Sequence, residues 1–156
     1  MRAGEFVSRV PTVVSRLTGQ PAPYYYEQFL RSQSGTFTLP GPMTIADGCY
    51  NGYYDVPGDM TNDIVTILQR EVLALVANGC THVKIDEPAL LNYPDKALEH
   101  GVDDIRIIFA GCPHHVKKEI ILSGDAGGTI DIGMDDSASN AIIKALEHYD
   151  IHQVKN

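Results

Sequence analysis

Apolar residues in the centre of the chain recur with the spacing of an α-helix, and the segments on either side alternate as β-strands do. The spacing predicts a helix from about Met60 to Asn78, with Asp59 or Thr61 as its N-terminal cap. Strands are predicted over Thr36–Leu39 before it and Thr81–Ile85 after it. The apolar stripe of the helix is formed by Ile64, Leu68, Val72, Leu75 and Val76. A strand, a long helix and a second strand predict a parallel βαβ unit.

The rest of the chain shows weaker versions of the same alternation. We expect a short strand near Thr12–Ser15, a helix over Pro94–His100, a strand over Glu119–Ser123 and a helix over Ser137–His148. The apolar run Asp103–Ala110 fits a strand or a helix, because short runs do not distinguish the two. The pattern predicts an α/β fold of about four βα units, in a single domain over residues 1–156.

Composition limits the classes of partner. The chain has 156 residues, with 20 Asp and Glu against 12 Lys and Arg, and its formal net charge of −8 argues against nucleic acid or an anionic membrane as partner. Three widely spaced cysteines suit free thiols in a reducing compartment, and no apolar run has membrane-spanning length, so we expect a cytoplasmic protein. The length disfavours a complete (β/α)8 barrel, which usually takes about 250 residues.

Candidate chemistry gathers where two predicted strands end. In parallel α/β folds the loops at the carboxyl ends of strands carry the functional groups. Here one strand runs into a glycine-containing turn at Thr38–Ile45 (TLPGPMTI), and another into two acidic residues at Ile85–Leu90 (IDEPAL). Neighbouring strand residues point in opposite directions, so one of Asp86 and Glu87 is expected to face a ligand and the other to hold a loop. Read alone, the acidic pair also fits a capped turn or a surface charge.

The two segments together resemble a known family. TLPGPMTIADG, followed after a helix by NGCTHVKIDEPAL, resembles the catalytic barrel of cobalamin-independent methionine synthase. The resemblance extends more loosely from about Arg9 to about Lys118, and residues 119–156 are expected to form a divergent C-terminal strand, loop and helix. It implies a partial TIM-barrel-like parallel sheet and a truncated homologue.

The resemblance also implies an activity. In that family zinc binds the thiol of homocysteine as a thiolate, which takes a methyl group from methyltetrahydrofolate in methionine biosynthesis. It implies a methyltransferase with a small-molecule thiol and a folate-type methyl donor as partners. The family role of binding the amino group of the amino-acid substrate is carried onto Asp86. Glu87, Pro42 and Thr44 are the other substrate-binding candidates, since they belong to the same two motifs.

The metal ligands of the family have no clear counterpart. Its zinc is held by a His-x-Cys pair, a Glu and a later Cys, and no His-x-Cys occurs in this sequence. Weak candidates are Cys112, His114 and His115, of residue types that bind zinc. A further weak candidate is Asp125, because ILSGDAGG is similar to the last barrel strand of metal-dependent amidohydrolases, where an aspartate contacts the metal.

The sequence therefore leaves three alternative functions open. The first is a methionine-synthase-like methyltransferase, and the second a barrel fragment without catalysis that acts as a binding or oligomerisation module. The third is a metal-dependent, amidohydrolase-like protein. Four parallel strands would leave two open edges and an apolar sheet face, so a homo-oligomer is expected in each case.

Overall fold

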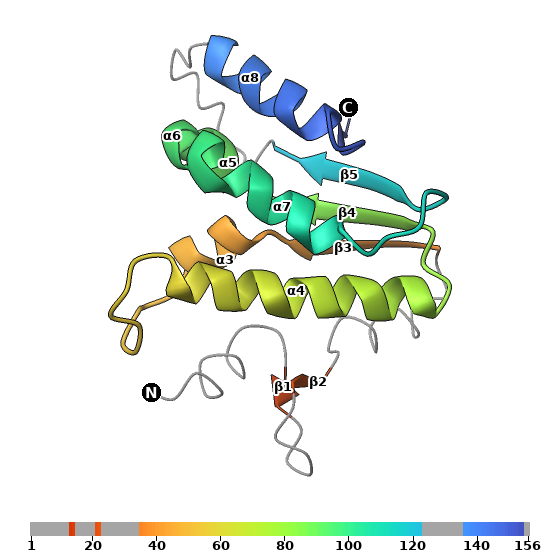
Figure 1. The fold of residues 1–156 in the computed structure, drawn as a ribbon, viewed down its shortest axis with the longest axis horizontal. Coiled ribbons are helices and arrows are strands. Elements are labelled where there is room, and N and C mark those ends of the chain that lie inside the picture. Colours follow the sequence, from red (N-terminus) through yellow and green to blue (C-terminus); the bar gives the residue numbers. More distant parts are fainter. Residues whose placement is uncertain (1–12, 15–20, 23–34, 123–135, 155–156) are drawn as a thin grey trace.

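A four-stranded parallel sheet with the order β3-β4-β5-β6 organises the molecule (Figure 1). The computed structural model describes residues 13–14, 21–22, 35–122 and 136–154. The sheet strands are β3 (Thr36–Pro40), β4 (His82–Asp86), β5 (Lys117–Ile121) and β6 (His152–Gln153). The helices are α3 (Pro42–Asp47), α4 (Asp59–Ala77), α5 (Ala89–Asn92), α6 (Pro94–Lys96), the π-helical turn η1 (Ala97–Gly101), α7 (Val102–Phe109) and α8 (Asp136–Glu147).

The helix α4 forms where the apolar stripe predicts it. Ile64, Leu68, Val72 and Leu75 are all buried, so the stripe faces the core. The predicted capping is wrong, because Asp59 already lies inside the helix and no side chain caps its amino end. Gly58 takes the N-cap position with a φ of 92°, a left-handed conformation that glycine adopts without steric cost.

The core lies between the sheet and the helices on one of its faces. Leu39, Ile85 and Ile120 are partners across β3, β4 and β5, and each is 0% exposed. The helices α4 and α7 contact each other and contribute to the same cluster of buried residues (Figure 1). Leucine and isoleucine side chains from three strands thus make one continuous apolar layer, which is the principal source of stability in such a fold.

The opposite face of the sheet is polar, which corrects the expectation of an apolar face. Side chains alternate along a strand, so the burial of Val83 and Ile85 under the helices turns His82, Lys84 and Asp86 to the other side. These three residues pair in register with Lys117, Glu119 and Ile121 of β5. His82 forms an ion pair with Glu119. Burial of apolar surface is therefore no argument for covering this face with a second subunit.

The predicted fold class is confirmed, with one change in the identity of a strand. The strand expected near Thr12–Ser15 is β1 (Val13–Val14), but it pairs antiparallel with β2 (Pro21–Ala22) and does not join the four-stranded sheet. The fourth parallel strand is β6. The ambiguous run Asp103–Ala110 is helical, since it lies mostly in α7.

Two further expectations concern thiols and membranes. The three cysteines are free, as expected from their spacing. Among the described residues, no helix combines the length and apolar character needed to cross a bilayer.

Candidate functional site

The two sequence motifs meet at the carboxyl ends of adjacent parallel strands. Pro40, the last residue of β3, is the register partner of Asp86, the last residue of β4. Beyond the register, the Gly41 amide donates a hydrogen bond to the Asp86 carbonyl over 2.8 Å. Pro42 then begins α3 at its first helical position, where the missing N–H of proline carries no penalty. The turn and the acidic pair are therefore one local structure.

Glu87 connects these motifs through its side chain. Its carboxylate is 0% exposed and accepts hydrogen bonds from the Met43 amide at 2.9 Å and from the Thr44 amide at 2.6 Å. The Thr44 hydroxyl donates a third bond at 2.5 Å. A Cβ atom at Gly41 would lie inside contact distance of the same carboxyl group, so the close approach requires glycine.

The surroundings of Glu87 change its acidity. Burial raises the pKa of Glu87 to about 7, and the nearby Asp104 adds to the increase, while the bonds from Thr44 and Met43 lower it. Burial also raises the pKa of the Asp104 carboxyl, and a hydrogen bond of 3.0 Å with His100 Nδ1 counteracts this. The carboxyl end of the sheet therefore contains two buried acids whose charges disfavour each other.

Asp86 occupies a different environment from its neighbour. It is half-buried on the polar face of the sheet, between Pro40 of β3 and Ile121 of β5. A carboxylate at the mouth of a parallel sheet can form an ion pair with an ammonium group of a ligand, because partial burial strengthens such a pair. Asp86 and Glu87 thus have different surroundings, as the alternation of strand residues suggests.

The other predicted substrate-binding residues belong to α3. Pro42 is buried at the start of the helix, and Thr44 is bonded to Glu87 through both its amide and its hydroxyl. The structure brings Pro42, Thr44 and Glu87 together, next to Asp86. Contact of these residues with a substrate stays a prediction.

The weak metal candidates do not gather at this end of the sheet. Cys112, His114 and His115 lie in the connection between α7 and β5, and so precede the amino end of β5, away from Asp86. In the described part of the chain, no three His, Cys, Asp or Glu side chains are arranged to hold a metal ion. Asp125 lies outside the described residues. The described donor set does not fit the zinc that the family resemblance implies.

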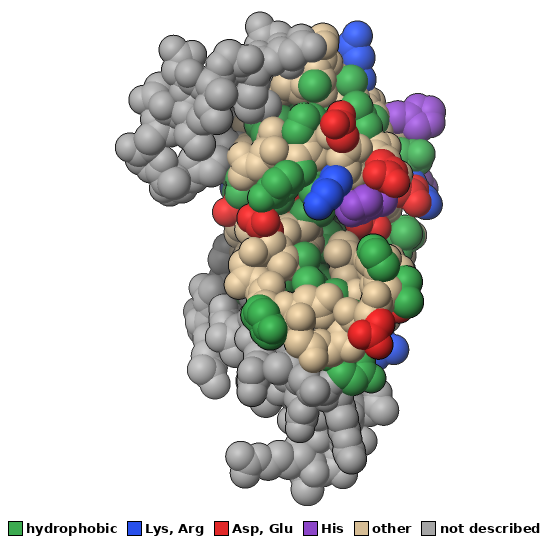
Figure 2. Space-filling model, turned by 90° about the vertical axis from the view of Figure 1, so that its left-hand side faces the viewer, with side chains coloured by type: hydrophobic (Ala, Val, Ile, Leu, Met, Phe, Trp, Pro, Cys, Tyr) green, Lys and Arg blue, Asp and Glu red, His purple; other side chains and the backbone are tan. Residues whose placement is uncertain are grey.

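Sequence reasoning missed a groove beside α3. It has a volume of about 480 Å³ and lies between α3, the start of α4 and the segment from Tyr93 to His100. Figure 2 faces this end of the molecule, where acidic, basic and histidine side chains gather beside apolar ones. Lys96 lies over the ring of Tyr93, whose hydroxyl donates to Asp47 over 2.9 Å. The helix predicted over Pro94–His100 is found as α6 and most of η1, but the π-helical winding that places His100 here was not predicted. At Gly101, the last residue of η1, a Cβ would contact Met43 and Leu90 at 2.7 Å.

Several known proteins similar to this chain are named methionine synthase. The methionine synthase of Thermococcus kodakarensis is 35% identical over 77 residues, covering 46% of this chain and 23% of that protein. The methionine synthase of Sulfurisphaera tokodaii is 26% identical over 153 residues, covering 94% of this chain and 44% of that protein. No protein-family model matches the chain. The chain thus spans less than half the length of these curated relatives.

A solved structure supports the fold. The B12-independent methionine synthase from Shewanella sp. W3-18-1, in complex with selenomethionine, superposes with a TM-score of 0.59 at 24% identity. The superposition covers 66% of this chain and 31% of that chain. It agrees with a partial TIM-barrel-like sheet. The predicted resemblance is confirmed in sequence and in fold: the chain is similar to archaeal methionine synthases over part of their length, and part of its fold matches that of the solved B12-independent enzyme.

Proposed function

We propose that the chain binds an amino-acid thiol of the homocysteine type at the carboxyl end of its sheet, with Asp86 holding the amino group. The bound thiol is the acceptor of a methyl group from methyltetrahydrofolate, the reaction implied by the family resemblance. The observation that carries the proposal is the hydrogen-bonded junction of the two motifs, in which Gly41 bonds Asp86 and α3 bonds Glu87. A junction of this kind fixes the position of Asp86 before any ligand arrives.

The chemistry assigned to this chain is recognition of the ammonium group. A carboxylate and an ammonium form a charge-assisted hydrogen bond, which is stronger than a bond between neutral groups. In the family, zinc supplies the low thiol pKa that makes sulfur nucleophilic at neutral pH. Since the described residues do not fit that ion, we assign no step of the methyl transfer to a metal here.

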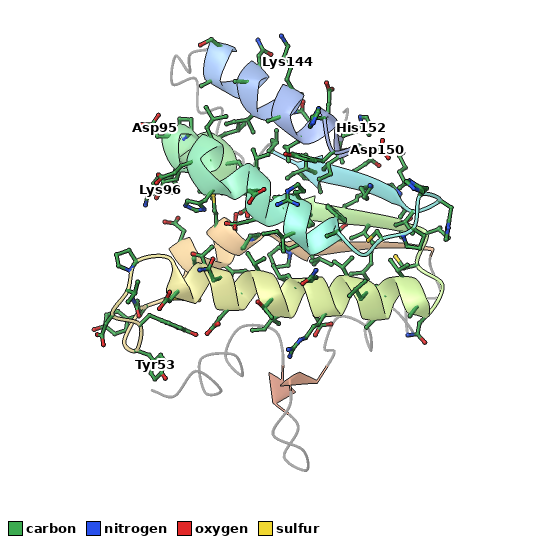
Figure 3. All side chains as sticks on the ribbon, viewed as in Figure 1. Tyr53, Asp95, Lys96, Lys144, Asp150 and His152 are labelled. Atoms are coloured by element: carbon green, nitrogen blue, oxygen red, sulfur yellow. The ribbon has the colours of Figure 1, made fainter. Side chains whose placement is uncertain are left out.

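Calorimetric titration with L-methionine tests the assignment, because methionine carries the same amino-acid group without a thiol that titrates. Asp86→Asn is expected to weaken binding about tenfold, since it replaces a charge-assisted bond by a neutral one. Asp95→Asn is the matched control, because Asp95 is exposed on α6 (Figure 3). Equal affinities of Asp86→Asn and the unchanged protein would contradict the proposed role of Asp86.

A binding module without catalysis is the second candidate. Two observations favour it. The bonds of the Glu87 carboxylate go to Met43 and Thr44 and hold α3 in place, and the described residues do not fit a zinc ion. The two candidates differ in one measurement: homocysteine methylation with a methyltetrahydrofolate donor, in zinc-supplemented buffer. Methionine binding with no methylation supports the module, whereas methylation with bound zinc supports the methyltransferase.

A further inference from the structure

Glu87 has no part in ligand contact under the proposed function, yet its carboxylate is fully buried and accepts three hydrogen bonds. We propose that Glu87 is a proton-sensitive positioning residue that fastens α3 to the end of β4 when ionised and releases it when protonated. The inference rests on the proposed function only for its effect on ligand binding. The fastening itself is a property of the fold.

The hydrogen bonds around Glu87 suit an ionised carboxylate. Oε2 accepts from the Met43 amide, and Oε1 accepts from both the amide and the hydroxyl of Thr44. Both oxygens therefore face donors. An ionised carboxylate has only acceptor sites and can satisfy all three donors at once.

A protonated carboxyl group cannot make the same set of bonds. One of its oxygens becomes a hydroxyl, whose hydrogen needs an acceptor in place of a donor. If Oε2 carries the proton, the Met43 amide faces an O–H group; if Oε1 carries it, two donors of Thr44 are affected. Protonation therefore weakens the hold on the first turn of α3. Because Gly41 joins that turn to the Asp86 carbonyl, the position of Asp86 is affected as well.

Burial, together with the groups near Glu87, sets the pH at which this happens. Asp104 on α7 disfavours the ionised form of Glu87, and His100 on η1 bonds to Asp104. Asp86 adjoins Glu87 in sequence at the end of β4, whereas the facing segment of α3 brings only peptide and hydroxyl donors. Burial is the largest cause of the increase, and the pKa of about 7 puts the change in protonation near neutral pH.

Backbone NMR tests the fastening without any ligand. The amide signals of Met43 and Thr44 are expected to shift together between pH 5 and pH 9, with one midpoint near 7. In Glu87→Gln this shift should disappear, while it should persist in Glu147→Gln, which alters an exposed glutamate at the end of α8. An unchanged titration of both amides in Glu87→Gln would overturn the proposal.

A second variant keeps the test valid if Glu87→Gln fails to fold. Thr44→Val removes one donor to the ionised carboxylate and nearly preserves the side-chain shape. The midpoint seen at the Met43 amide should then rise, because the ionised form has lost a hydrogen bond. A midpoint that stays in place or falls would contradict the proposed contact.

Ligand binding measures the effect on Asp86. With a midpoint near 7, about one tenth of the molecules are fastened at pH 6, so the affinity for L-methionine should fall about tenfold from pH 8 to pH 6. In Glu87→Gln the affinity should lose this dependence. Amides that titrate without methionine binding at any pH would contradict the proposed function and leave the fastening supported. Binding that is independent of pH in the unchanged protein would contradict the positioning role.

Discussion

The carboxylate of Glu87 is buried at the centre of the candidate site. Its three hydrogen bonds favour the ionised form, but burial outweighs them and raises the pKa of the group to about 7. The folded protein therefore binds a proton at Glu87 more tightly than the unfolded chain does. At and above neutral pH, where Glu87 is ionised, this group therefore lowers the free energy of unfolding.

The sign of this effect gives a stability prediction. Between pH 4.5, the ordinary value, and about 7, the folded state carries more protons at Glu87 than the unfolded state, so the free energy of unfolding falls as pH rises. Denaturant unfolding should show a loss of about 1 to 3 kcal/mol over this window, relative to Glu87→Gln. Taking the difference between the two proteins removes the contributions of other acids. Parallel pH profiles in the two proteins would contradict the assignment.

The sequence predicted part of the site at this scale. The opposite directions of neighbouring strand residues led to the expectation that one member of the acidic pair holds a loop, and Glu87 does hold the start of α3. The partners of Glu87 could not be predicted, because Met43 and Thr44 bond mainly through backbone amides that no residue type reveals. The raised pKa could not be predicted either, since it depends on burial and on Asp104, which lies on another element.

The long helix α4 and the alternating strands β3 and β4 were predictable, and the short helix α3 was not. The helix α4 begins and ends within one residue of its prediction, since 19 residues show the period several times. The six residues of α3 are too few for a period, although Pro42 marks its first turn. The turn η1 follows α6 without a break, and its last residue, Gly101, lies against Met43 of α3 and Leu90 of α5.

The two glycines that flank α3 allow a controlled test of packing. Gly41→Ala would place a methyl group against the Glu87 carboxyl, which is buried and held by three bonds, so we expect about 1 to 3 kcal/mol of destabilisation. Gly48→Ala is the matched control, because its added Cβ would meet the nearest atom at an ordinary 3.6 Å and its φ of −83° suits alanine. Thermal unfolding measures both. Equal melting temperatures of the two variants would contradict the close approach at Gly41.

At the scale of the whole molecule, the number of parallel strands was predicted and one strand was misplaced. The fourth strand is β6, a segment of two residues that is too short to leave a pattern. The polar face of the sheet was also unexpected, because the resemblance to a barrel says nothing about how a partial sheet treats its inner surface. Alternation along β4 accounts for it once the helix-covered side is known.

Self-association stays a prediction, now based on sheet edges. Within the described residues, β3 pairs only with β4, and β6 only with β5, so each presents an edge to which another strand can add. We expect two copies in each particle, which light scattering at several protein concentrations would detect. A constant monomer mass across the concentration range would contradict this expectation.

The bonds that Glu87 makes with peptide groups also determine which neighbouring substitutions the site tolerates. Met43 contributes only its amide, so leucine at this position preserves the bond as long as its side chain fits beside η1. Position 44 needs a hydroxyl for the third bond, which serine supplies and alanine lacks. In a library of variants selected for methionine binding, position 43 should therefore accept side chains that fit the available space. Position 44 should accept side chains with a hydroxyl group. The buried Glu87 carboxylate thus restricts the side chains that positions 43 and 44 accept, and it restricts each of them differently.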